Sequence, residues 1–180
     1  MLLISNQTFI RDIFSAFFNR SHYAVGAPKG EKAQGTVHIC HSCFTGDHDK
    51  NKDIVIKGVD SKPPLSYGSR FGQALAAVNI DGKGADELVV GAPLHSDEDH
   101  DYGAVKVYKI TFSTWKPEQV SIPIPTQLTP GSRFGSAIEN LGDIHNDGFE
   151  DFVVSAPYLG DDKAGAIFIY RGNVDFNFGK

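Results

Sequence analysis

An acidic segment near the C-terminus has the spacing of a cation-binding loop. It runs from Asp143 to Asp151 and reads Asp-Ile-His-Asn-Asp-Gly-Phe-Glu-Asp. Side chains at alternate positions can point into one concavity, because Gly148 permits the sharp turn between them. Several oxygen ligands, mostly carboxylates with one backbone carbonyl, suit a hard cation, so this loop predicts a calcium site. The expected ligands are Asp143, His145, Asp147, the carbonyl of Phe149 and Asp151.

The residues that follow this loop separate it from an EF-hand. The twelfth position of an EF-hand loop needs Glu, whereas Val154 stands there inside an apolar run. His145 is the weak point of the ligand set, because imidazole nitrogen suits calcium poorly. A polar β-turn without an ion is the alternative, since Asp, Asn and Gly are common in turns.

A second loop, residues 79–87, lies at the matching place about 64 residues earlier in the chain. Lys83 stands there where the third acceptor belongs, and its ammonium group would repel a divalent ion. It could instead neutralise Asp81 and Glu87 from inside the loop. The first copy of the pattern has Asn19-Arg20-Ser21-His22 instead, which predicts no ion.

The two loops belong to a longer repeat that carries three further markers. Gly-Ala-Pro at 26–28 recurs at 91–93, and as Ser-Ala-Pro at 155–157. Ser-Arg-Phe-Gly occurs at 69–72 and again at 132–135. A Gly precedes a strand-like run of β-branched and aromatic residues at Gly35, Gly103 and Gly165. The chain therefore contains three copies of one unit.

Each unit predicts four short strands. In the second unit these are Ala74–Val78, Leu88–Val90, the run after Gly103 and a fourth at Gln127–Leu128, with residues 54–56 as the fourth strand one unit earlier. Four strands per repeat form a propeller blade, which buries both faces only against neighbouring blades. We expect an all-β fold, a partial β-propeller of four-stranded antiparallel blades. A β-sandwich is the alternative.

The markers divide the chain into a degenerate unit at 21–62, a unit at 63–125 and a unit with the calcium loop at 126–180. Residues 1–20 are unassigned. The apolar spacing of Phe9–Phe18 fits a short amphipathic helix, and an aberrant start of the chain is the alternative.

Composition limits the classes of partner. The chain has 180 residues, 41% of them hydrophobic, which is enough for a core, and a net charge of −5. Acidic balance argues against nucleic acid, since sequence-independent binding to phosphates needs clustered Lys and Arg. No apolar stretch approaches the ~18 residues that a membrane-spanning helix needs. Residues 1–4 are too short for a signal peptide, so we expect the chain to be a fragment if the protein works outside the cell.

Phe-Gly, the acidic nonapeptide and Gly-Ala-Pro, in that order, resemble the FG-GAP repeat, and residues from about 22 to 173 are similar to part of the seven-bladed propeller of integrin α subunits. Asp143, Asp147, Phe149 and Asp151 match the calcium-ligand positions of that family, and His145 departs from them. In the second loop the candidate calcium ligands that match the family's positions are Asn79, Asp81, Ala85 and Glu87, whereas Lys83 departs from the pattern.

The resemblance implies a cell-adhesion receptor on the extracellular side of the plasma membrane. Its propeller would pair with an integrin β subunit, bind extracellular matrix or cell-surface protein ligands, and be stiffened by Ca²⁺. It implies no enzymatic activity, and membrane attachment only through segments absent from this chain. A propeller attached to a secreted glycosylphosphatidylinositol phospholipase D-like enzyme is the alternative, because such enzymes carry similar repeats.

Cys40-His41-Ser42-Cys43, with His48 and Asp53, has the spacing of a zinc knuckle whose last ligand is Asp. A lone C-x-x-C is a weak signal, and a disulfide is favoured outside the cell. Asn6 and Asn19 begin glycosylation sequons. No G-x-S-x-G or H-E-x-x-H motif indicates a catalytic site.

Overall fold

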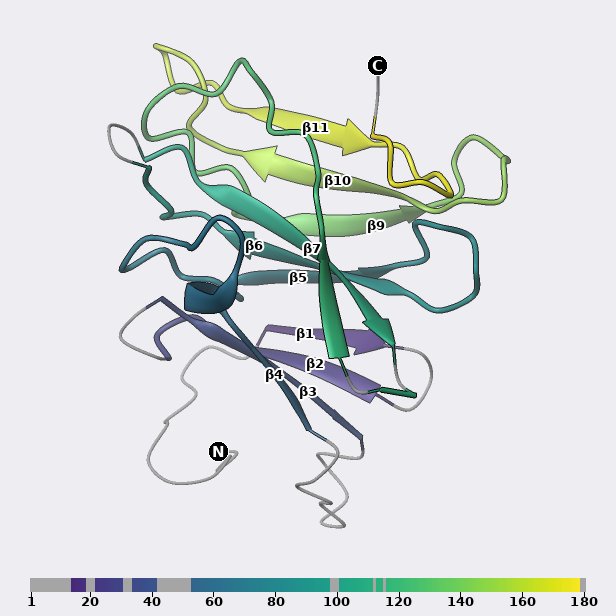
Figure 1. Cartoon of the computed structure of the whole chain (residues 1–180). Coiled ribbons are helices and arrows are strands. Elements are labelled where there is room, and N and C mark those ends of the chain that lie inside the picture. The colour runs from purple at the N-terminus through teal and green to yellow at the C-terminus, as the bar shows by residue number, and fades with distance from the viewer. Residues whose placement is uncertain are drawn as a thin grey trace.

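The computed structural model describes residues 14–18, 22–30, 34–41, 53–97, 101–111, 113–114 and 116–178. Three antiparallel sheets lie one above another, in the order in which the chain forms them (Figure 1). The first contains β1 (Phe14–Phe18), β2 (His22–Ala27), β3 (Thr36–His41) and β4 (Ile54–Lys57). The second contains β5 (Ala74–Val78), β6 (Glu87–Ala92), β7 (Ala104–Thr111) and β8 (Lys116–Val120). The third contains β9 (Ile138–Gly142), β10 (Asp151–Ala156) and β11 (Ala166–Tyr170).

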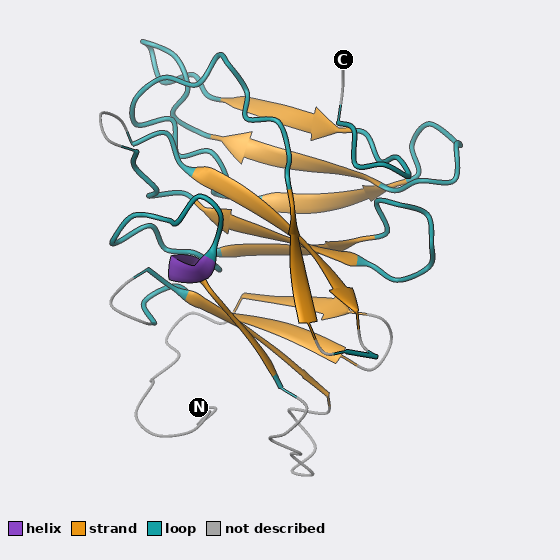
Figure 2. Cartoon of the chain, viewed as in Figure 1, coloured by secondary structure: helices purple, strands orange, loops and turns teal. Residues whose placement is uncertain are grey.

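Each sheet is a meander whose neighbouring strands follow one another in the chain. Where the structure describes the connections, they are loops apart from a short 3-10 turn, η2 (Gly58–Asp60), after β4 (Figure 2). β5 packs against β1 and β9, so the first strands of the three sheets lie along one side of the stack. This is the arrangement of consecutive propeller blades, whose first strands line the central axis. The all-β fold of blade-like antiparallel sheets is confirmed, with three strands in the third sheet among the described residues.

The helix expected over Phe9–Phe18 is wrong for the part that the structure describes. Residues Phe14 to Phe18 form β1, which pairs antiparallel with β2 from Phe14 opposite Gly26 to Phe18 opposite His22. Aromatic residues suit strands, and the open edge of β2 offers unpaired backbone groups that need partners. Sheet pairing therefore prevails over a helical spacing, and five residues of the unassigned segment join the first sheet.

The fourth strand of the second sheet is not at Gln127–Leu128, where the chain makes a turn. It is β8, which pairs with β7 from Val107 opposite Val120 to Thr111 opposite Lys116. A short connection after β7 brings β8 alongside it first. The strand lacks an apolar pattern because it is an exposed edge, where Pro117 is tolerated. The fourth strand expected at residues 54–56 is confirmed as β4.

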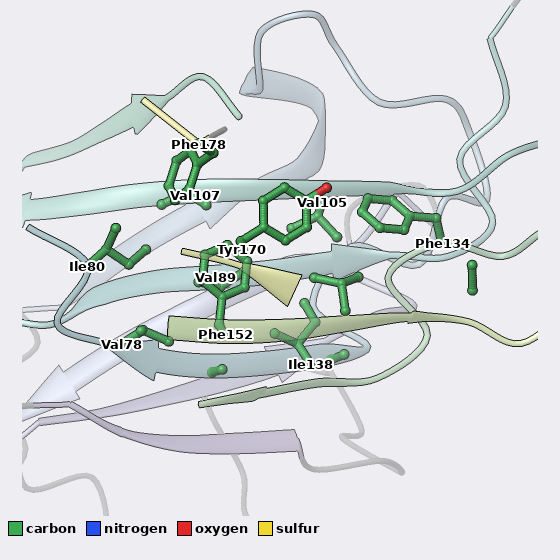
Figure 3. Close-up of a cluster of buried hydrophobic side chains, with 14 residues drawn as sticks. Val78, Ile80, Val89, Val105, Val107, Phe134, Ile138, Phe152, Tyr170 and Phe178 are labelled. Carbon is green, nitrogen blue, oxygen red and sulfur yellow. The ribbon is translucent and has the colours of Figure 1, made fainter. Parts of the chain in front are cut away.

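Two apolar layers hold the sheets together. All six residues of β6 are buried, because alternate side chains enter different layers. Leu88 and Val90 join the layer against the first sheet, and Val89 joins the layer against the third. Figure 3 shows the second layer, where Val78, Val89, Val105 and Val107 meet the aromatic side chains Phe134, Phe152, Tyr170 and Phe178.

The outer face of the third sheet is uncovered. Ile167 is 67% exposed and Ile169 is 56% exposed on β11, whereas Phe168 packs toward the buried layer. A blade buries both faces only between two neighbours, and this sheet has its inner face buried and its outer face exposed. The described chain places no further sheet against that face.

The Phe-Gly and Gly-Ala-Pro markers meet where one sheet contacts the next. Gly72 and Gly135 have φ of 89° and 90°, which favour glycine. A Cβ on Gly26 would lie 2.0 Å from the carbonyl oxygen of Gly72, and one on Gly91 would lie 2.2 Å from that of Gly135. The backbones approach too closely for any side chain, which explains why these glycines recur.

Candidate functional site

The two acidic loops lie next to each other at one end of the stack. Residues 79–86 connect β5 to β6, and residues 143–150 connect β9 to β10 (Figure 1). Glu150 joins them: its backbone N–H donates to the Asn79 carbonyl at 3.1 Å, and its carboxylate accepts from the Asn79 N–H at 2.9 Å. Asn140 donates to the same carboxylate at 2.8 Å. Glu150 was not expected as a site residue, and it couples the geometries of the two loops.

In the third unit, carboxylates shape the loop through backbone hydrogen bonds. Asp143 accepts from the N–H groups of Asp147 at 3.0 Å and Gly148 at 2.8 Å. Asp147 accepts from the N–H of Phe149 at 3.2 Å. Asn146 and Gly148 have positive φ, of 56° and 89°, so both take left-handed conformations that Asn and Gly tolerate. These hydrogen bonds place Asp143 and Asp147 in one turn of the loop.

Asp151 and His145 form a second pair in the same loop. The Asp151 side chain is fully buried, and one of its oxygens lies 2.7 Å from Nδ1 of His145. The other oxygen accepts from the N–H of Gly172 at 2.9 Å. A buried carboxylate needs such partners, because its desolvation is costly. His145 therefore lies beside the expected ligand Asp151, as its partner in an ion pair when the imidazole is protonated.

Arg171 completes the surroundings of the third-unit loop. Its Nε and a terminal nitrogen donate to one Asp147 oxygen at 2.9 and 2.7 Å. This guanidinium lowers the pKa of Asp147 below its ordinary value. The side chain of Arg171 is 59% exposed, so the pair lies at the surface.

The second-unit loop is more buried and holds its charges differently. Asp81 is 2% exposed. It forms a direct ion pair with the ammonium of Lys109 from β7, and Nζ of Lys83 lies 3.5 Å from the same oxygen. Burial alone would raise the pKa of Asp81, but the hydrogen bonds from the Lys109 ammonium and the Lys83 backbone N–H, together with the charges of both lysines, outweigh it and lower the pKa. Lys83 was expected to neutralise Asp81 and Glu87. Its distance to Asp81 agrees with this, although Lys109 makes the closer contact, and the cation that acts on Glu87 is Lys109.

Glu87 is buried beneath this loop. Its carboxylate accepts from the N–H groups of Ile80 at 3.0 Å and Asp81 at 3.4 Å. Burial, with the Asp81 charge second, raises the pKa of Glu87 to about 7. Asn79 accepts from the N–H of Gly84 at 3.3 Å. Glu87 and Asn79 thus fasten the loop backbone from inside.

The two loops differ in how well their residues suit calcium. Among the described residues, no group of three or more His, Cys, Asp and Glu side chains is arranged as a metal-ligand set. The donor types of the third-unit loop nevertheless fit a hard cation, with three carboxylates and the Phe149 carbonyl, and its Arg171 partner is exposed. The second-unit loop fits poorly, because its buried Asp81 already faces two ammonium groups.

Spacing within a loop does not reveal Lys109 and Arg171, which come from another part of the unit. A signal for them is present in the repeat, since Lys109 follows Tyr108 six residues after Gly103, and Arg171 follows Tyr170 six residues after Gly165. Aligning the Gly-led strands places both basic residues at one position.

The remaining sequence predictions concern cysteines and membranes. Cys40 is disulfide-bonded, which removes the thiolate that a zinc ion would need. Cys43, His48, Asn6, Asn19 and the first-unit loop at 19–21 lie outside the described residues. In the part of the chain that the structure describes, we find no helix with the length and apolarity to cross a bilayer.

Comparison with known proteins returns integrin α subunits. The chain is 31% identical to integrin alpha-5 of Xenopus laevis over 157 residues, 83% of this chain and 13% of the relative. It is 39% identical to integrin alpha-4 of Xenopus laevis over 147 residues, 82% of this chain and 13% of the relative. Integrin alpha-PS3 of Drosophila melanogaster is 32% identical over 168 residues, 89% of this chain and 14% of the relative.

No protein-family model matches the chain. The relatives nevertheless cover most of it at 31% to 39% identity, although it spans only 13–14% of their length. Three repeat units, stacked antiparallel sheets and glycine contacts at the repeat markers agree with these matches. Together they identify the chain as a segment of the integrin α family.

Proposed function

We propose that this chain is part of the propeller of a non-enzymatic adhesion receptor on the extracellular side of the plasma membrane. In this proposal the propeller pairs with an integrin β subunit and binds an extracellular matrix or cell-surface protein ligand. The observation that carries the proposal is the match to integrin α subunits over 82–89% of the chain. The blade-like sheets and their repeat markers support it, because they are the parts that a propeller reuses.

Co-expression with integrin β subunits of the source organism tests the pairing. The full chain, carrying an affinity tag, should retain a β subunit after washing, whereas an unrelated propeller of similar size should not. Failure with every β subunit, while the chain elutes as a folded species, would contradict the pairing.

The proposal includes a calcium ion at the third-unit loop. When bound, the ion would supply the positive charge that holds several carboxylate oxygens together. Asp143 already orders the turn through backbone hydrogen bonds, and the exposed Arg171 side chain can leave Asp147 for solvent. The residues that would hold calcium are Asp143, Asp147, the carbonyl of Phe149 and Asp151, with His145 beside them.

Replacing Asp147 by Ala tests this site. A ligand that binds only the folded chain stabilises it by about 2.7 kcal/mol when its concentration is 100-fold above Kd. The melting temperature of the full chain should therefore rise with calcium relative to a chelator, and Asp147→Ala should abolish that rise. Asp161→Ala removes an exposed carboxylate from another loop and should leave the rise intact. Equal calcium responses in all three proteins would contradict the site.

A further inference from the structure

We propose that the ammonium group of Lys109 takes the place of a divalent cation in the second-unit loop, residues 79–87. This loop would then be fastened by the chain itself and would not respond to calcium. The proposal rests on the geometry around Asp81 and does not depend on calcium in the third-unit loop.

The first step is the position of Lys109 in the repeat. Lys109 in β7 and Arg171 after β11 are equivalent residues, and each reaches back to the acidic loop of its own unit. Lys109 pairs with Asp81 at the third position of its loop, and Arg171 pairs with Asp147 at the fifth. A basic residue at this point of a unit is thus placed to contact the carboxylates that would otherwise surround a cation.

The second step is burial. The Asp81 side chain is 1% exposed and that of Lys109 is 34% exposed, whereas Asp147 and Arg171 are 25% and 59% exposed. Charges interact more strongly where water is excluded, and a buried carboxylate that loses its closest cation is less well compensated than an exposed one. Displacing Lys109 therefore costs more free energy than displacing Arg171.

The third step is the number of positive charges already present. Lys83 places its Nζ 3.5 Å from the same Asp81 oxygen that Lys109 contacts, so a divalent ion would meet two ammonium groups. The backbone N–H of Lys83 occupies the other Asp81 oxygen at 3.0 Å. Both oxygens of the most central carboxylate in the loop are therefore already engaged.

The fourth step is what holds Lys109 in place. Its Nζ lies 5.5 Å from the centre of the Phe176 ring, a cation–π distance. Phe176 belongs to the segment after β11, in the third unit. Lys109 thus links its own loop to the neighbouring unit without a metal, while Glu150 ties the third-unit loop to Asn79 from the other side.

The test uses the full chain carrying Asp147→Ala, so that the third-unit loop does not contribute. Its melting temperature is measured in a chelator and at about 10 mM calcium, tenfold above the weakest dissociation constants, ~1 mM, of extracellular calcium modules. We expect no calcium-dependent rise. A rise that disappears when Asp81→Asn is added would overturn the proposal. Loss of the calcium response in the unmodified chain would instead contradict the third-unit site and leave this inference standing.

A double-mutant cycle tests the role of the ammonium directly. In chelator, Lys109→Met should lower the melting temperature, because Asp81 loses its closest cation, and Lys116→Met on the exposed edge strand should not. Combining Lys109→Met with Asp81→Asn removes both charges and should recover part of the loss. If Lys109→Met does not fold, the double variant should still fold. A double variant that loses as much as the sum of the single changes would overturn the proposal.

Discussion

The second and third units share one pattern but sit in different surroundings. The second unit lies between two sheets, and its acidic loop is buried around Asp81 and neutralised by lysines. The third unit has one open face, and its loop is exposed at Asp147 and Arg171. The comparison teaches that spacing of carboxylates does not by itself decide whether a loop takes a metal ion. The two loops also differ in burial and in the basic residue that faces their carboxylates, Lys109 in one and Arg171 in the other.

The contacts between neighbouring sheets also differ between the second and third units. Gly91 in the second unit lies against Gly135 of the next sheet, where a side chain would collide with a carbonyl oxygen. The third unit has Ser155 at this position, and its hydroxyl accepts from the N–H of Ala137 at 2.9 Å. A position that must be Gly between two sheets accepts a side chain where no further sheet of the described chain approaches.

The largest effect should come from the layer between the second and third units. Phe134 is 1% exposed and packs against Phe168 and Tyr170. Removing a buried Phe side chain costs about 3–5 kcal/mol. We expect Phe134→Ala to lower the free energy of unfolding in urea by this amount, and Ile169→Ala on the open face to change it by roughly 0.5 kcal/mol or less. Equal losses would mean that the open face is covered in solution.

A smaller difference in stability is expected between substitutions at Gly91 and at Ser155. In Gly91→Ala the new Cβ would lie 2.2 Å from the Gly135 carbonyl oxygen, so the two sheets must move apart. Such overpacking costs about 1–3 kcal/mol. Ser155→Ala loses one hydrogen bond, about 1 kcal/mol. Urea unfolding of both variants measures the difference, and a Gly91→Ala chain as stable as the unmodified one would show that the sheet contact is loose.

The markers that recur along the chain predicted the three units and the strands around each acidic loop. Gly72 and Gly91 carry this information because a close backbone approach admits only Gly. The exposed edge strand β8 was missed, since Lys116-Pro117-Glu118 has no apolar alternation to indicate a strand. β1 was mistaken for a helix because its partner strand, not its own spacing, decides its conformation.

The acidic loops were only partly predictable for a related reason. The spacing located the carboxylates, but Lys109 and Arg171, which neutralise Asp81 and Asp147, come from 28 and 24 positions further along the chain. Lys109 and Arg171 approach the loops because each third strand ends beside the start of the second strand, with Tyr108 opposite Leu88 and Tyr170 opposite Phe152. Only an alignment of the repeats, or the folded structure, shows that these basic residues lie beside the acidic loops.

The smallest expected effect is a contribution of the second unit to the pH dependence of stability. His95 of the second unit accepts a hydrogen bond from the Ser66 N–H at 3.0 Å, and Leu159 stands at its place in the third unit. Burial lowers the pKa of His95 below its ordinary value of 6.5, the nearby Lys106 charge lowers it further, and Asp97 opposes them.

Because the folded pKa is depressed, the contribution of His95 is present above pH 6.5 and is lost as the pH falls through the lower folded value. The loss should be about 0.5–1.5 kcal/mol, the net worth of a hydrogen bond. Urea unfolding at about pH 7.5 and about pH 5.5, on either side of the unperturbed histidine pKa, measures it. His95→Leu, which copies the third unit, should remove this part of the pH dependence. An identical pH dependence in both proteins would show that the histidine stays neutral, or is equally protonated, in the folded and unfolded chains.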